Sequence, residues 1–155
     1  IGYRALRFAG EHADLISGVV AVDGLPIFPG MGRVSAEQRL AMAAEKIAYK
    51  ENIVYSGPVY QAAKKEGNKI SISFSNIGGG LITNDGEEPQ EFAVAGADKK
   101  FVWARAKIEG DRVIVWNDEV EDPVYIRYAW ADDPVNPNLC NKEGLPASPF
   151  EGMYN

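Results

Sequence analysis

The stretch Lys69-Ile70-Ser71-Ile72-Ser73-Phe74-Ser75 decides the fold, because large apolar residues alternate in it with serines. Successive side chains of a strand point to opposite faces, so this pattern predicts a strand with one buried and one solvated face. Gly67-Asn68 comes directly before it, after residues 62–66. A Gly-Asn pair between two extended runs is typical of a tight hairpin.

Similar turn signals separate further extended segments in the second half of the chain. About six or seven strands of this kind predict an antiparallel β-sandwich of roughly a hundred residues. The turn signals are Asn84-Asp85-Gly86 after residues 81–83, Gly110-Asp111 between residues 101–108 and 113–116, and Asp122-Pro123 before a final strand over residues 124–130. The remaining stretch, residues 131–155, is rich in proline and aperiodic, which predicts a tail either disordered or held against another surface.

The first third of the chain has a helical period instead. Gly18-Val19-Val20-Ala21-Val22 is a short apolar run, typical of a strand covered on both faces. Ser35 and Gln38 form a capping-box pattern ahead of a helix predicted over residues 36–50.

We therefore expect an α+β chain in which residues 1–51 form a short α/β section and residues 52–155 form the antiparallel β-sandwich with its Pro-rich tail. A lone strand that is apolar on both faces needs neighbours to cover it. This predicts a missing N-terminal partner, either covalent in the natural protein or a separate polypeptide.

Composition excludes several classes of function. The 16 Lys+Arg residues against 22 Asp+Glu give a formal charge of −6, and no basic block is dense enough to bind nucleic acid. No apolar run approaches the ~20 residues that span a bilayer, and no signal peptide is visible. The single Cys, Cys140, excludes an intrachain disulfide and a zinc site built on Cys pairs. The single His, His12, leaves few catalytic constellations, and no cofactor is expected.

Several motifs occur in one order along the second half. Together they resemble the C-terminal portion of the sialate O-acetylesterase family, carbohydrate esterases of the SGNH-hydrolase superfamily. The helix at residues 37–49 resembles the last helix of that family's catalytic domain, and residues 17–23 match more thinly. The matching motifs are Asn52-Ile53-Val54-Tyr55-Ser56-Gly57-Pro58-Val59-Tyr60, Ala95-Gly96-Ala97-Asp98-Lys99-Lys100-Phe101-Val102, Ala106-Lys107-Ile108-Glu109-Gly110, Val124-Tyr125-Ile126-Arg127-Tyr128-Ala129-Trp130 and Asn138-Leu139-Cys140-Asn141-Lys142-Glu143-Gly144-Leu145-Pro146-Ala147-Ser148-Pro149-Phe150.

The resemblance implies that residues 1–51 are the end of an SGNH hydrolase domain, whose catalytic Ser lies in a Gly-Gln-Ser-Asn type motif and whose His lies in an Asp-Ile-His-Pro type loop. Acyl transfer needs that base within reach of the hydroxyl. Here the loop is Leu25-Pro26-Ile27-Phe28-Pro29, so Phe28 or a neighbour stands where the imidazole belongs. We therefore assign no catalytic residue. The serines that lack the motif are Ser17, Ser35, Ser56, Ser71, Ser73, Ser75 and Ser148.

Other candidate residues have ordinary structural explanations. His12 precedes the predicted strand and is expected on a helix surface, without a nucleophile beside it. Asp23 follows that strand, where ligands of α/β sheets collect, although a turn-forming Asp is the simpler interpretation. Gly78-Gly79-Gly80 lies between strand patterns and predicts a sharp connection rather than a phosphate loop.

Aromatic and acidic residues of the sandwich offer a further possibility. Flat rings can stack on sugars, but alternation places most of these rings with core residues, so we expect them to be core. The acidic residues are expected to be solvated turn charges. The rings are Trp103, Trp116, Tyr125, Tyr128 and Trp130, and the acids are Glu119, Glu121, Asp122, Asp132 and Asp133.

Three functions follow as hypotheses. The first is the C-terminal section of a sialate O-acetylesterase-like hydrolase, acting through the parent on acetylated sialic acids or related sugars and not catalytic alone. The second is a non-catalytic carbohydrate-binding or structural β-domain. The third is a degenerate esterase relative, which Phe28 favours. The resemblance also implies a secreted, periplasmic or lysosome-like location, with no nucleic-acid or membrane partner.

Overall fold

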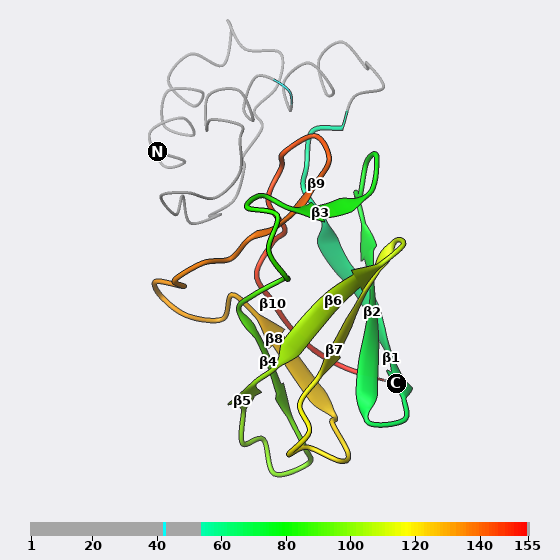
Figure 1. Ribbon diagram of the computed structural model, residues 1–155, viewed down its shortest axis with the longest axis vertical. Coiled ribbons are helices and arrows are strands. Elements are labelled where there is room, and N and C mark those ends of the chain that lie inside the picture. The colour runs from blue at the N-terminus through cyan, green and yellow to red at the C-terminus, as the bar shows by residue number, and fades with distance from the viewer. Residues whose placement is uncertain (1–41, 43–53, 155) are drawn as a thin grey trace, which may run out of the picture.

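The structure is a computed structural model that describes Met42 and residues 54–154 (Figure 1). Residues 54–154 contain ten strands and no helix. The strands are β1 (Val59–Glu66), β2 (Lys69–Ser75), β3 (Leu81–Thr83), β4 (Phe92–Ala95), β5 (Val102–Trp103), β6 (Arg105–Glu109), β7 (Arg112–Trp116), β8 (Tyr125–Tyr128), β9 (Leu139–Asn141) and β10 (Phe150–Met153).

Two four-stranded antiparallel sheets form the body of the sandwich. One has the order β1-β2-β7-β6 and the other the order β10-β8-β4-β5, while β3 and β9 pair as a separate ribbon at one end (Figure 1). Both sheets are antiparallel throughout, which is the arrangement that one-sided alternation favours.

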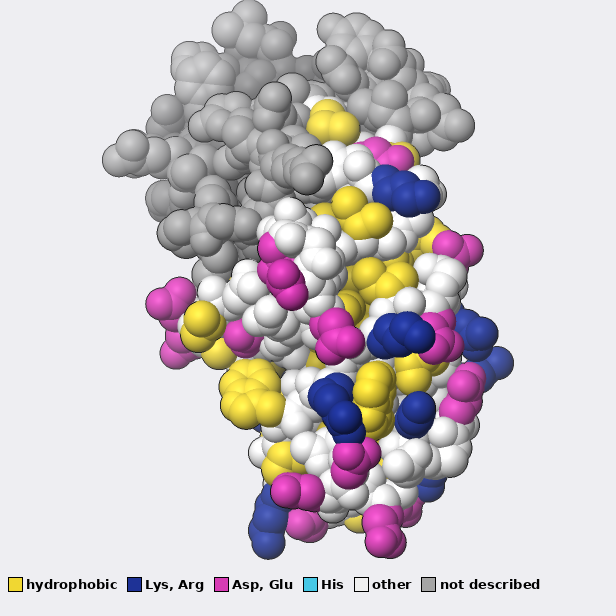
Figure 2. All heavy atoms as spheres, in the orientation of Figure 1, with side chains coloured by type: hydrophobic (Ala, Val, Ile, Leu, Met, Phe, Trp, Pro, Cys, Tyr) yellow, Lys and Arg dark blue, Asp and Glu magenta, His cyan; other side chains and the backbone are white. Residues whose placement is uncertain are grey.

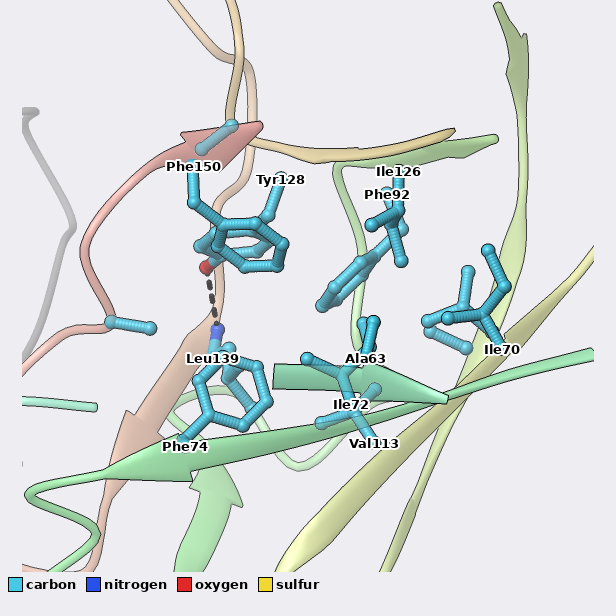
Figure 3. Close-up of a cluster of buried hydrophobic side chains, with 14 of the residues drawn as sticks. Ala63, Ile70, Ile72, Phe74, Phe92, Val113, Ile126, Tyr128, Leu139 and Phe150 are labelled. Atoms are coloured by element: carbon cyan, nitrogen blue, oxygen red, sulfur yellow. Dashed lines mark hydrogen bonds between the residues drawn. The ribbon is translucent and has the colours of Figure 1, made fainter. Parts of the chain in front are cut away.

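The core lies between the sheets, as the alternation predicts. Ile70, Ile72 and Phe74 of β2 are buried, and they face Phe92, Ile126 and Tyr128 of the opposite sheet (Figure 3). Phe150 of β10 completes an aromatic cluster: its ring centroid lies 5.9 Å from that of Phe74 and 5.9 Å from that of Tyr128. The large hydrophobic side chains that are fully buried are Tyr128, Phe92, Ile70, Ile72, Ile126, Leu139, Leu145, Val94, Val113 and Val115.

The expected α+β class is wrong for the part of the chain that the structure describes. That part is nearly all β with antiparallel sheets, because its extended segments pair with one another and the tail adds two further strands, β9 and β10. The strand predicted at residues 18–22 lies outside the described residues, and so does the helix predicted at residues 36–50, Met42 excepted. The boundary near residue 52 also lies outside them and stays a prediction.

Two predicted hairpins are confirmed, and a third turn is not a hairpin. Gly67, with φ of 66°, turns β1 into β2, and Gly110, with φ of 61°, turns β6 into β7. Asn84-Asp85-Gly86 follows β3, but β3 pairs with the distant β9. The segment predicted as the final strand is β8, and two more strands follow it.

The tail is integrated into the sandwich. Its β9 strand pairs with β3, and its β10 strand is the edge of one sheet, hydrogen-bonded to β8. The alternative of a tail held against a surface is therefore the correct one, and that surface is the sandwich itself. These pairings could not be predicted from the sequence, because the two strands are short and lie between aperiodic segments that contain prolines.

Candidate functional site

Buried amide side chains hold together the end of the sandwich that carries β3 and β9. Asn138 is fully buried, and its Nδ2 donates to Asp85 Oδ1 at 3.0 Å and to the Glu88 carbonyl at 3.0 Å. Its Oδ1 accepts a hydrogen bond from the Gln90 N–H at 2.9 Å. Buried polar groups are stabilising only when paired in this way, so Asn138 fixes the loop after β3.

Asn141 is the second fully buried amide of this end. Its Oδ1 accepts from the Leu145 N–H at 2.9 Å, and its Nδ2 donates to the carbonyls of Ser56 at 3.3 Å and Asn76 at 3.4 Å. One side chain therefore ties three separate segments of backbone. Leu145 is also fully buried, so the amide and the apolar anchor act on the same loop.

The same loop clamps the segment through which the chain enters the sandwich. The Ser148 N–H donates to the Pro58 carbonyl at 2.9 Å. Gly57 packs so closely on the Pro146 carbonyl that an added Cβ would overlap its oxygen. We call residues 54–58 together with residues 138–148 the joint. Because the joint is tied by buried hydrogen bonds, residues 54–58 are a fixed strut and not a loose linker.

Two carboxylates at this end, those of Glu143 and Asp85, accept hydrogen bonds from neighbouring N–H groups. Glu143 Oε1 accepts from the Gly79 N–H at 2.9 Å, whereas its buried Oε2 has no donor among the described residues. Desolvation by itself would raise the pKa of the Asp85 carboxyl. Hydrogen bonds from Asn136, from the Glu87 N–H and from Asn138 outweigh that effect, and the pKa lies below its usual value. Asp85 is therefore a stable anionic acceptor for the joint.

Tyr128 connects the joint to the core. Its hydroxyl accepts a hydrogen bond from the Leu139 N–H at 3.1 Å, as the dashed line in Figure 3 marks. Burial raises the pKa of this phenol above its usual value, because a phenolate would be poorly solvated there. The expectation that Tyr128 is core is confirmed, and its polar end positions β9.

The outer face of the β10-β8-β4-β5 sheet exposes aromatic side chains. Register places Glu151, Arg127, Ala93 and Trp103 in one row across the four strands. The Arg127 guanidinium lies 3.7 Å from the centroid of the Phe101 ring, and its Nε donates to Glu151 Oε2 at 2.5 Å. Trp103 is 70% exposed, so the expectation that it is core is wrong.

Trp130 reaches the same outer face by a break in the strand pattern. Ala129 has φ of 47°, a left-handed conformation that interrupts the alternation after Tyr128. Trp130 therefore lies outside, 55% exposed, with its ring centroid 5.8 Å from Arg127 Cζ. The prediction that Trp130 shares the buried face of Ile126 is wrong, because the alternation stops at Ala129. We call Phe101, Trp103, Tyr125, Arg127, Trp130 and Glu151 the aromatic face.

On the outer face of the other sheet, basic side chains lie over the tryptophan ring, Trp116. Lys69 Nζ lies 4.9 Å from the centroid of the Trp116 ring, and Arg105 Cζ lies 5.3 Å from it. Figure 2 shows hydrophobic side chains between Lys and Arg side chains over β6 and β7. Cation–π contacts of this kind cover the ring, which is only partly exposed.

The opposite end of the sandwich has an open hollow of about 510 Å³. Two of its acidic side chains are engaged locally: Asp122 pairs with Lys65, and Asp98 Oδ1 accepts from the Lys100 N–H. No cluster of His, Cys, Asp and Glu suited to a metal occurs among residues 54–154 or at Met42. The acidic residues at the hollow are therefore exposed charges in turns, as the sequence predicted. Its lining is Gly96, Ala97, Asp98, Lys100, Val102, Glu119, Val120, Glu121 and Asp122.

The described serines show no activating base. Ser56, Ser73 and Ser75 donate to backbone carbonyls, and Ser71 Oγ accepts from Arg112. His12, Asp23 and Phe28 lie outside the described residues, so the absence of a catalytic pair there stays a prediction. Gly78-Gly79-Gly80 is a turn with Gly80 N–H donating to the Ile77 carbonyl at 2.9 Å, as expected. Within the described part, no helix is long and apolar enough to span a membrane.

Comparison with known proteins identifies a related enzyme. No family model and no curated protein matches the chain. A solved structure of a carbohydrate acetylesterase from Xanthomonas citri is similar, with 46% sequence identity and a TM-score of 0.71. The match covers 74% of this chain and 26% of that one. The chain is related to a carbohydrate esterase. It spans about a quarter of that enzyme's length, and the sialate-specific resemblance is not confirmed.

Proposed function

We propose that the chain is the C-terminal section of a Ser-dependent carbohydrate esterase that removes O-acetyl groups from sialic acids or related sugars, and that it is not catalytic alone. The observation that carries the proposal is the 46% identity to a carbohydrate acetylesterase, over 74% of this chain but 26% of that enzyme. Such identity over a shared sandwich indicates a common ancestor for this section. The remaining three quarters of that enzyme leave room for the nucleophile and base elsewhere.

The role we assign to the sandwich is support for a hydrolase portion. Asn141 ties the Ser56 carbonyl to the loop before Leu145, and the Ser148 N–H ties Pro58 to the same loop. A strut held in this way transmits a fixed orientation to whatever precedes it along the chain. Positioning matters for acyl transfer because the nucleophile, base and oxyanion donors must keep their mutual geometry.

The partner implied is an N-terminal hydrolase portion, covalent or supplied as a separate chain. The buried Glu143 Oε2, which has no donor among the described residues, would be stabilised by a donor from that portion. An acetylated glycan would be reached through the parent enzyme. A secreted, periplasmic or lysosome-like location fits such a substrate and belongs to the same proposal.

The test compares acetate release by this chain alone with release by the chain joined to its natural upstream sequence. We expect no release above buffer from 9-O-acetylated sialic acid or from acetylated xylan with the chain alone. The joined protein is expected to hydrolyse the sialic acid ester. Turnover by the chain alone would overturn the assignment. Release from acetylated xylan only would keep the esterase but reject the sialate substrate.

A further inference from the structure

We propose that the aromatic face binds an extended chain of neutral, β-1,4-linked pyranose sugars. The proposal does not rest on the esterase function assigned above. The ligand class follows from three properties of the described residues: exposed indole rings, a row of side chains in register across four strands, and a guanidinium whose charge is already paired.

The exposed indoles are the first observation. Trp103 is 70% exposed and Trp130 is 55% exposed, although both lie in a domain whose core takes up other large rings. Large exposed apolar groups that gather on one face commonly mark a binding surface. The π face of an indole is electron-rich, and the axial C–H groups of a pyranose carry partial positive charge, so the two stack in water.

The alignment of side chains in one row is the second observation. Ala93 lies between Arg127 and Trp103 in register, so a small residue separates the ring from the ion pair. Four adjacent strands spaced ~4.8 Å apart give a row of about 14 Å, long enough for about two to three sugar rings. Chains with β-1,4 linkages are extended and present flat apolar faces, which match a row more closely than a pocket.

The paired charge is the third observation. Arg127 Nε already donates to Glu151 at 2.5 Å and its guanidinium stacks on Phe101, so its charge is balanced by a carboxylate before any ligand binds. The pair still offers N–H donors and carboxylate lone pairs at its edge. Sugar hydroxyls can donate and accept at once, so they suit such a pair, whereas a sialic acid carboxylate would compete with Glu151.

Isothermal titration of the full 155-residue chain with cellohexaose and with xylohexaose tests the proposal. We expect saturable binding of at least one of them and at least tenfold weaker binding, ~1.4 kcal/mol, for Trp103→Ala and for Trp130→Ala. Trp116→Phe on the other sheet is the matched control and should leave affinity within twofold. Sialyllactose should bind more weakly than the neutral hexasaccharide.

Three results would overturn the proposal. The first is no binding of either hexasaccharide by the wild-type chain while circular dichroism shows it folded. The second is unchanged affinity in the Trp103→Ala, Trp130→Ala double variant. The third is a wild-type dimer in sedimentation equilibrium that Trp103→Ala dissociates, because the face would then be covered by a second copy. None of these results depends on acetate release, so they leave the esterase assignment to its own experiment.

Discussion

Polar side chains are usually exposed and large apolar ones buried, and the joint and the aromatic face depart from this rule in opposite directions. At the joint, Asn138 and Asn141 are polar and fully buried, with both ends of each amide hydrogen-bonded. On the aromatic face, Trp103 and Trp130 are large, apolar and exposed. A buried polar group must find its partners inside the fold, whereas an exposed ring leaves its partner to be supplied from outside.

This difference separates stability from recognition. Substitutions at the joint should change the free energy of unfolding, because they leave backbone groups without partners or force atoms together. Substitutions on the aromatic face should change ligand affinity and leave folding almost unaffected. The predictions below challenge that separation, beginning with the site where the largest loss of stability is expected.

Gly57→Ala should be the most destabilising, by about 3 kcal/mol or more, since an added Cβ would overlap the Pro146 carbonyl oxygen. The backbone on both sides must move, which separates residues 54–58 from residues 138–148 of the joint. Urea denaturation followed by circular dichroism measures the loss. Gly110→Ala is the control: its added Cβ meets nothing within 4 Å, and only its φ of 61° costs, about 1 kcal/mol. Equal losses in the two variants would show that the joint is not close-packed.

Asn141→Ala should cost about 2–3 kcal/mol, because the Leu145 N–H and the Ser56 and Asn76 carbonyls lose their partner inside the fold. The same denaturation measurement applies. Asn68→Ala, at an exposed turn position, is the matched control and should stay within about 0.5 kcal/mol of wild type. A small loss in Asn141→Ala would mean that water replaces the amide, and hence that the joint is open.

Tyr128→Phe should cost about 1–2 kcal/mol at neutral pH, because the buried Leu139 N–H loses its acceptor. The variant should also flatten the alkaline limb of stability. The folded-state pKa of Tyr128 is raised above its ordinary value of about 10, so wild type is fully stabilised below pH ~10 and loses stability as the pH rises further. The free energy of unfolding between pH 9 and pH 11 is the measurement. A wild-type curve parallel to that of the variant would contradict a buried, protonated phenol.

Local patterns predicted the body of the sandwich well. Ile70, Ile72 and Phe74 are core as alternation requires, and Gly67 and Gly110 turn hairpins as expected. These features depend on neighbours in sequence, so a single sequence contains them. The carbohydrate-esterase relationship was likewise available from motifs such as the one beginning at Asn138, although its sialate-specific form is not confirmed.

The features that sequence reasoning missed depend on long-range pairing. β3 pairs with β9 across more than fifty residues, and all three residues of β9 belong to a motif whose buried amides gave no periodic signal. Trp130 was predicted on the buried face, but the left-handed conformation of Ala129 interrupts the alternation and turns the next side chain outward. Trp103 shares a face with Phe101, as expected, but alternation alone does not say which face is outer. An exposed aromatic row could therefore be recognised only once the register of four strands was known.

Trp103→Ala should change the free energy of unfolding least, by less than about 0.5 kcal/mol, because its ring is mostly exposed in the folded state. Phe92→Ala is the contrasting variant: the same sheet buries that ring completely, and its removal should cost about 3–5 kcal/mol. Denaturation of both variants at one protein concentration makes the comparison. A loss of 2 kcal/mol or more in Trp103→Ala, by the scale of ordinary surface substitutions, would show that the indole contributes to folding. Its exposure would then no longer argue for an external partner, and the distinction between the joint and the aromatic face would fail.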